Sequence, residues 1–208
     1  MNPNLAEENL QTIRTLMERS ALYRRALAPI MLLAGVMGLA AASIGSLMHI
    51  DSTRAFGVLW LATAAIVVTG AFLIARRQAL KDSENFWSPP TRRVAQALSL
   101  PLSAGLVLGV LFTFAPANPG IDFTLLLPFL WALLYGCALH SAGAFILRGI
   151  RWFGWIYVIF ASSALGFVLF VNPNIEISDN CLMGIFFGGL HLAYGIYLYF
   201  TEKKTSAA

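Results

Sequence analysis

The chain has 208 residues, of which 58% are hydrophobic and 12% are charged, with a formal net charge of +4 at pH 7. A soluble domain carries about 25% charged residues, so the composition excludes a water-soluble globular protein. The two cysteines, Cys137 and Cys181, are far apart and match neither a disulfide nor a metal-binding pattern.

Residues 1–26 are expected to form an amphipathic helix in the cytoplasmic interface of the membrane. Leu10, Ile13, Met17 and Ala21 recur at helical spacing, and the polar residues lie largely on the other faces. Arginines beside the first span favour a membrane anchor, and a helix that binds a partner is the alternative. No short apolar stretch precedes a small-residue cleavage site, so we expect no signal peptide.

Six windows without a charged residue follow, at about 27–48, 55–75, 94–115, 123–147, 152–171 and 182–200. Each is long enough to cross a hydrocarbon core about 30 Å thick as a helix. We therefore predict an all-α integral membrane protein with a six-helix transmembrane domain over 27–200 and a cytoplasmic tail over 201–208.

The basic residues predict the orientation of these spans. With the N-terminus in the cytoplasm, every one of the 14 lysines and arginines except Arg54 falls on the cytoplasmic side. Such a bias predicts that both termini are cytoplasmic, in a multi-pass protein of the inner (plasma) membrane. Because the membrane accounts for the basic patches, we expect the lipid bilayer as a partner and no nucleic acid.

Small residues form ridges on the first and last spans, where they allow two helix backbones to approach closely. Packing within the chain is one use of these ridges, and a homo-oligomer or a membrane partner subunit is the other. The ridges consist of Gly35, Gly38 and Gly45 on the first span and Gly184, Gly188 and Gly195 on the last.

Aromatic residues gather near the predicted inner ends of the last two spans. Trp152, Trp155 and Tyr157 begin the fifth span, and Tyr194 and Tyr197 lie near the end of the sixth. Tryptophan and tyrosine are enriched at membrane–water interfaces, so we interpret both groups as interfacial belts. A quinone or lipid pocket is the alternative.

The spans contain no Asp, Glu, Lys or Arg at depth. Ion-coupled carriers keep such groups in the membrane for function, so their absence argues against coupling by carboxylates and against carboxylate proteases. The motifs HExxH and GxSxG, phosphate-binding loops and paired CxxC are absent as well. We therefore expect no catalytic site and no metal site of those types, and a protein that is not an enzyme of these families.

Two histidines remain as candidates for chemistry. His140 and His191 lie in the fourth and sixth spans at depths that agree within about one helical turn. Each has glycines on its own helical face, and glycine leaves room for a neighbouring helix or for a flat ligand. These glycines are Gly136 and Gly143 beside His140, and Gly188 and Gly195 beside His191.

Three hypotheses follow for the pair. Each histidine can form a hydrogen bond across a packed interface, to Ser141, Ser162, Ser163 or a backbone carbonyl. The pair can instead hold a b-type haem or a transition metal through neutral imidazoles. Binding of a substrate or quinone is the third.

For the whole protein we predict a small-solute or lipid carrier, or an accessory subunit of a membrane assembly, without a cofactor. The first alternative is a redox subunit that holds haem b between the fourth and sixth spans. The second is a membrane sensor that uses the N-terminal helix and the long polar connection over 76–93.

Overall fold

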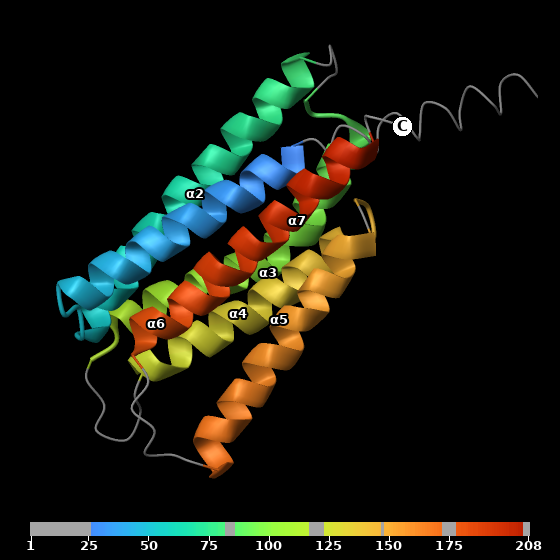
Figure 1. Cartoon of the computed structure of the whole chain (residues 1–208). Helices are drawn as coiled ribbons and strands as arrows, with labels where there is room; N and C mark the ends of the chain where they lie inside the picture. Colours follow the sequence, from blue (N-terminus) through green and yellow to red (C-terminus); the bar gives the residue numbers. More distant parts are fainter. Residues whose placement is uncertain (1–25, 82–85, 117–122, 147, 172–177, 206–208) are drawn as a thin grey trace, which may run out of the picture.

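The structure, a computed structural model, describes residues 26–81, 86–116, 123–146, 148–171 and 178–205 (Figure 1). The predicted interfacial helix over 1–26 lies outside these residues except for Ala26, and so do residues 206–208 of the tail. Within the described ranges the regular structure is helical and contains no strand.

The described residues contain six helices that are long and apolar enough to cross a membrane. They indicate a multi-span membrane protein, as the hydropathy of the sequence predicts. The first helix, Ala26–Leu47, has no label in Figure 1. The others are α2 (Thr53–Lys81), α3 (Pro89–Phe114), α4 (Phe123–Ala142), α5 (Arg148–Gly166) with η1 (Phe167–Val171), and the last span of α6 (Asp179–Met183), η2 (Gly184–Gly189) and α7 (Leu190–Thr205).

The helix ends differ from the predicted windows where local chemistry overrides apolarity. α2 continues to Lys81 because arginine, glutamine and lysine are good helix formers that extend a helix beyond the apolar core. α3 begins at Pro89, since proline at the first position of a helix lacks only an N–H that would be unpaired there. α4 ends at Ala142 rather than at 147, and a turn closes there with a hydrogen bond of 2.9 Å from Phe145 N to Ala142 O.

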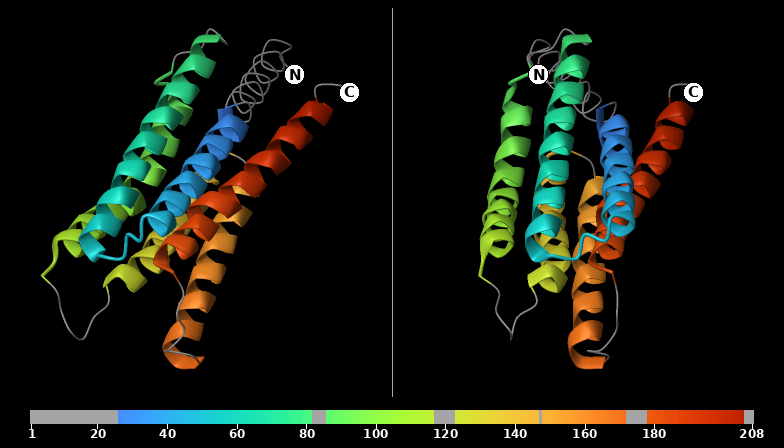
Figure 2. Two further views of the ribbon diagram at one scale, coloured as in Figure 1. Left: turned by 60° about the vertical axis from the view of Figure 1, so that its left-hand side comes forward. Right: turned by 90° about the vertical axis from the view of Figure 1, so that its left-hand side faces the viewer.

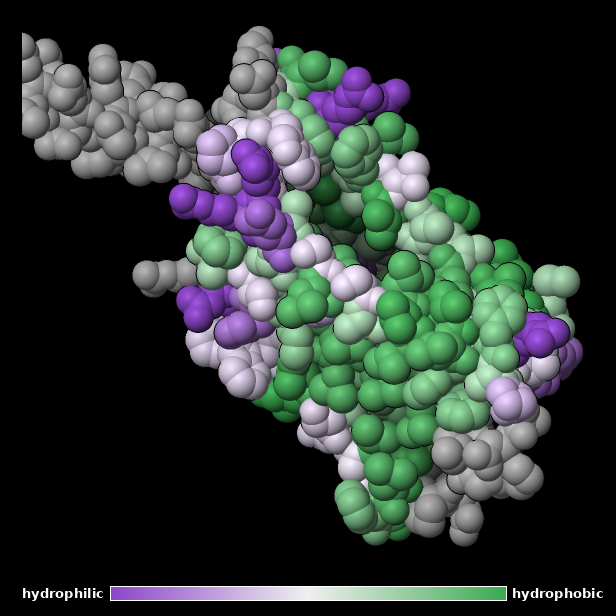
Figure 3. All heavy atoms as spheres, turned by 180° about the vertical axis from the view of Figure 1, so that it is seen from behind, coloured by the Kyte–Doolittle hydropathy of each residue, from purple (hydrophilic) through white to green (hydrophobic). Residues whose placement is uncertain are grey.

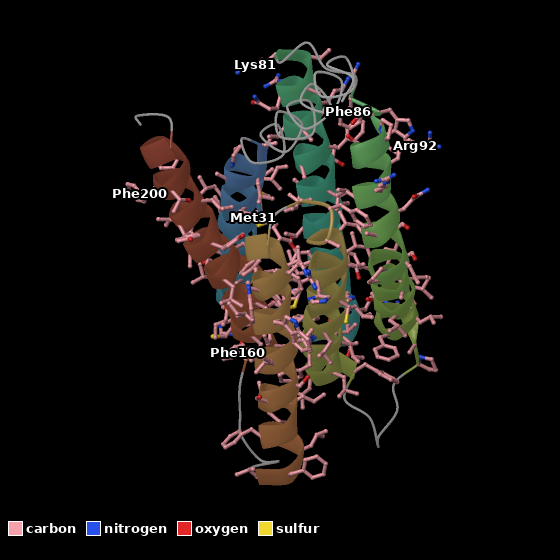
Figure 4. The ribbon with its side chains drawn as sticks, turned by 90° about the vertical axis from the view of Figure 1, so that its right-hand side faces the viewer. Met31, Lys81, Phe86, Arg92, Phe160 and Phe200 are labelled. Atoms are coloured by element: carbon pink, nitrogen blue, oxygen red, sulfur yellow. The ribbon has the colours of Figure 1, made fainter. Side chains whose placement is uncertain are left out.

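α4 is the central helix of the bundle, packed against α3 on one side and α5 on the other. The first helix and the last span lie side by side, and α2 and α3 form a hairpin beside them (Figure 2). Arg76, Lys81 and Arg92 mark what we call the basic end of the bundle, and the opposite end, where α2, α4 and α6 begin, is the distal end. Figure 4 shows Lys81 and Arg92 together at the basic end.

The first helix and the last span are in direct backbone contact. A Cβ atom placed on Gly35 would lie 2.6 Å from the backbone nitrogen of Leu192, and one on Gly195 would lie 2.9 Å from that of Leu32. Two helices can approach this closely only where small residues face each other. The small-residue ridges of these two spans are therefore used within the chain.

Hydrogen bonds join the distal ends of four helices. The indole nitrogen of Trp60 donates to Asn180 Oδ1 at 3.1 Å, and Asn180 Nδ2 donates to the carbonyl of Ile50 at 3.1 Å. The hydroxyls of Thr53 and Thr124 lie 2.6 Å apart. These five residues, which we call the distal clamp, connect the turn that follows the first helix with α2, α4 and α6.

Candidate functional site

His191 lies in the first turn of α7 and is buried, with 2% of its surface exposed. Aromatic rings from three other elements surround it: Tyr135 of α4, Phe153 and Tyr157 of α5, and Phe187 of η2. Their ring centroids lie between 5.1 and 6.1 Å from that of the imidazole. The histidine therefore stands where the fourth, fifth and last spans meet.

Both imidazole nitrogens are hydrogen-bonded to tyrosine hydroxyls. Nε2 lies 2.7 Å from the hydroxyl of Tyr135, and Nδ1 lies 2.9 Å from that of Tyr157. The Tyr157 hydroxyl in turn donates to the backbone carbonyl of Phe186. Phe186 belongs to the π-helical segment η2, and such segments are common next to functional side chains.

The carbonyl of Phe186 sets the direction of every bond in this network. A carbonyl only accepts, so Tyr157 donates its proton there and must accept a hydrogen bond from Nδ1–H of His191. Nε2 of the neutral ring is then the acceptor for the Tyr135 hydroxyl. The network ends at the Phe186 carbonyl and links the fourth, fifth and last spans. We call Tyr135, His191 and Tyr157 the core triad.

His140 has a different environment on α4. Its ring is partly buried and lies edge to face with that of Trp155, at a centroid distance of 5.5 Å. Its Nδ1 atom is buried and has no hydrogen-bond partner among the described residues. None of the ring contacts or hydrogen bonds described for the two histidines joins His140 to His191.

The glycines beside the histidines are in contact with neighbouring helices. A Cβ on Gly136 would lie 2.8 Å from Cβ of Tyr157, and one on Gly143 would lie 2.6 Å from the backbone nitrogen of Arg151. Gly188 and Gly195 face the first helix in the same way. The four glycines therefore provide close helix packing, and the room that a haem would require at this pair is filled by the chain itself.

A bis-histidine haem does not fit the described residues for a second reason. An imidazole that ligates iron needs one nitrogen free of other bonds, and both nitrogens of His191 are engaged by tyrosines.

Sequence reasoning missed both tyrosines of the core triad. Tyr135 was not singled out, and the assignment of Tyr157 to an interfacial belt is wrong, because its side chain is fully buried. Trp152 and Trp155, which were grouped with it, are exposed. The available signal was helical phase: Phe153, Tyr157 and Ala161 recur every four residues on one face of α5, and all three are buried.

A second feature is the unequal packing of the α2–α3 hairpin. In the apolar windows of the first, fourth and last spans 44% of the residues are buried, compared with 11% for α2, 17% for α3 and 22% for the fifth span. The buried residues of α2 are Phe56, Gly57, Trp60 and Thr63, all near the distal end, and then Ala79. The buried residues of α2 are therefore concentrated in its distal part, whereas α3 also contacts α4 in mid-span, where the Trp131 indole donates to the Gly105 carbonyl at 2.8 Å.

The space-filling view shows how hydropathy is distributed over one face of the molecule (Figure 3). A hydrophobic surface covers the middle of the molecule, and hydrophilic side chains gather toward its ends (Figure 3). A recess walled by hydrophobic residues opens in this face toward the basic end. Toward the same end the ribbons of the hairpin, the first helix and α7 spread apart (Figure 2).

No family model, no curated protein and no solved structure matches the chain. A functional proposal for this membrane protein therefore rests on its own residues and their arrangement.

Proposed function

We propose that the protein is a carrier of a small apolar or amphipathic solute, with its basic end facing the cytoplasm. The observation that carries this proposal is the low burial of the α2–α3 hairpin, together with the concentration of the buried residues of α2 near the distal end. A carrier that exposes its site to one side at a time needs such an asymmetry.

The two parts of the molecule differ in how firmly they are joined. Glycine contacts hold the first helix against the last span, and the core triad ties that span to α4 and α5. The hairpin is tied to this unit by the distal clamp and by a hydrogen bond of 2.8 Å from the Trp131 indole of α4 to the Gly105 carbonyl of α3. Within the hairpin, a Cβ on Gly57 of α2 would overlap the side chain of Thr113 on α3. In our proposal the hairpin rocks against the rest of the bundle, and the clamp opens when the basic end closes.

The chemistry of the interior suits a neutral or amphipathic solute. The apolar windows of the six spans contain no acidic or basic residue at depth, so nothing in them compensates an unpaired ion, and an ion in hydrocarbon is costly. The polar atoms of the core triad are hydrogen-bonded to one another and to the Phe186 carbonyl, so they need no ligand as a partner. A solute that crosses between the hairpin and the bundle would be held mainly by apolar contacts.

Distances between spin labels test the proposal in lipid nanodiscs. One pair of labels spans the basic end, at Lys81→Cys and Phe200→Cys, where both positions are exposed (Figure 4). The two native cysteines are removed from this variant by Cys137→Ala and Cys181→Ala. A second pair, Ala55→Cys with the native Cys181, spans the distal end. A carrier should show two label-to-label distances at each end. In the state in which the distance at the basic end is short, the distance at the distal end should be long, and the reverse.

A control pair belongs inside the unit that the glycines hold together. Val36→Cys and Ile196→Cys are exposed positions on the first helix and α7, and their distance should stay single and constant. A single distance at both ends of the hairpin, as sharp as that of the control, would contradict the carrier proposal.

An accessory subunit of a membrane assembly is the second candidate, and the far end of α5 favours it. Phe170 is 86% exposed and Val171 is 68% exposed, and this end extends beyond the other helices (Figure 1). Copurification of a stoichiometric partner, lost on Phe170→Ala and kept on the matched change Phe200→Ala, would support this function instead.

A further inference from the structure

A surface hollow of about 280 Å³ lies at the basic end, on the first turns of α3. Its lining combines one cation, one amide, one hydroxyl and one indole. The lining residues are Trp87, Arg92, Ala95, Gln96 and Ser99.

The polar lining forms one stripe along α3. Arg92, Gln96 and Ser99 are spaced by four and three residues, so they share a helical face. Val94 and Gly105 lie on the opposite face and are buried in the bundle. The hollow therefore opens away from the bundle, on the surface that a lipid would contact, and it is separate from the core triad.

Arg92 provides the donors of the hollow. Its side chain is exposed and forms no ion pair with any residue that the structure describes. A guanidinium binds phosphate oxygens through paired hydrogen bonds, and the amide of Gln96 one turn further on adds two donors. The hydroxyl of Ser99 donates to the carbonyl of Gln96 at 2.8 Å, so its oxygen remains an acceptor.

The polarity of the same stripe falls with depth in the membrane. Beyond Ser99 it continues through Ser103 to Leu106 and Val110, and the last two side chains are exposed. At about 1.5 Å per residue, Arg92 and Ser99 are about 10 Å apart along the axis. That length matches a headgroup and glycerol region, with the acyl chains lying on the leucine and valine.

Trp87 closes the hollow from the side. Its ring is next to that of Phe86, with centroids 6.3 Å apart, and Phe86 packs edge to face on Phe72 of α2 at 5.1 Å. Tryptophan prefers the headgroup level of a bilayer. Trp87 therefore marks the depth at which a headgroup would lie.

We propose that this hollow is a binding site for the phosphate group of an anionic amphiphile, and that the amphiphile is a membrane phospholipid. The site recognises phosphate through Arg92 and Gln96 and the acyl chains through the apolar continuation of α3. The inference does not depend on whether the protein transports a solute.

Native mass spectrometry of the full-length protein in mild detergent tests the site, with phosphatidylglycerol and phosphatidylcholine as probes. The wild type should bind phosphatidylglycerol more tightly than phosphatidylcholine. Arg92→Gln should weaken the binding of phosphatidylglycerol about tenfold or more, since it removes a charge-assisted bond. Gln96→Leu should weaken it less.

Arg93→Gln is the matched control, because Arg93 is exposed, carries the same charge and does not line the hollow. It should leave the affinity within about twofold, since an exposed charge that does not line the hollow contributes little. Equal losses in the two variants, or equal binding of the two lipids, would overturn the proposal in favour of a diffuse attraction to basic charge.

The source of the phosphate is tested by competition with glycerol phosphate, which has the headgroup chemistry and no acyl chain. Displacement of the lipid only at a large excess of glycerol phosphate would support a phospholipid site. Displacement at equal concentration would mean that the acyl chains contribute nothing, and it would assign the hollow to a soluble phosphate ester instead.

Discussion

The hydroxyl of Tyr157 satisfies two buried groups at once, Nδ1 of His191 and the carbonyl of Phe186. The Tyr135 hydroxyl satisfies one, Nε2 of the same ring. A buried polar atom without a partner is costly in a membrane, where no water can replace the lost bond. The two tyrosines are therefore unequal in what their removal leaves behind.

Tyr157→Phe should destabilise the protein more than Tyr135→Phe. The first change removes two hydrogen bonds and the second removes one, and hydrogen bonds between membrane helices contribute about 0.6 to 2 kcal/mol each. Denaturation in mixed detergent micelles measures the free energy of unfolding of both variants. Equal losses would contradict the bond directions that we assign to the core triad.

His49 has a backbone angle φ of 50°, the left-handed conformation that favours glycine. It follows the first helix, and the next amide, Ile50 N, donates to the carbonyl of Gly45 at 2.9 Å. This pattern of bonds is the helix termination in which glycine usually occupies the left-handed position. The conformation at His49 is therefore strained for a residue with a Cβ atom.

His49→Gly should stabilise the protein by about 1 kcal/mol, because the left-handed conformation costs a residue with a Cβ atom roughly that much free energy. The same detergent denaturation measures the gain. Met48→Gly is the control: its residue precedes the left-handed position and is 69% exposed, so glycine there should bring no gain. A loss of stability in His49→Gly would show that its side chain matters more than its backbone angle.

At the scale of elements, the glycines determine which helices lie together. A Cβ atom on Gly38 would overlap the carbonyl oxygen of Phe187 and lie 2.8 Å from the backbone nitrogen of Gly188. Both contacts are with backbone, which cannot turn aside as a side chain would. Gly166 at the end of α5 differs, because a Cβ there would have nothing within 4 Å.

Gly38→Ala should therefore destabilise the protein by about 1 to 3 kcal/mol, the usual result of overpacking. Gly166→Ala is the matched change, and it should be neutral or stabilise by up to about 1 kcal/mol through helix propensity. Thermal unfolding in nanodiscs compares the two. If Gly38→Ala were as mild as Gly166→Ala, the close contact between the first helix and the last span would be in error.

At the scale of the molecule, hydropathy predicted the six helices because each span must bury its backbone polar groups in hydrocarbon. It could not predict which way each helix faces, since lipid and protein interior are equally apolar. Tyr157 was misplaced for that reason: an aromatic residue near a span's end is typical of an interface, but the rotation of α5 directs this one to His191. Serines were likewise among the expected partners of His191, and tyrosine hydroxyls lie beside its two nitrogens instead.

Loss of the distal clamp should change how the hairpin sits on the bundle. Asn180 is 3% exposed. Its side-chain amide accepts a hydrogen bond from the Trp60 indole and donates one to the Ile50 carbonyl. Asn180→Leu keeps the branched shape of the side chain but leaves these two groups unpaired, which costs about 1 to 3 kcal/mol for each group. Since the clamp holds the distal end closed, the variant should favour the state in which that end is open.

The spin-label pair Ala55→Cys with Cys181 measures this shift as a longer distance at the distal end, and the pair Lys81→Cys with Phe200→Cys should shorten in step. Ser178→Ala is the control, because the Ser178 side chain makes no capping bond at the start of α6. A distal distance that lengthens while the basic end stays unchanged would mean local fraying of the clamp. A coupled change at both ends is expected only of a hairpin that moves as a rigid body, and that motion is what a carrier requires.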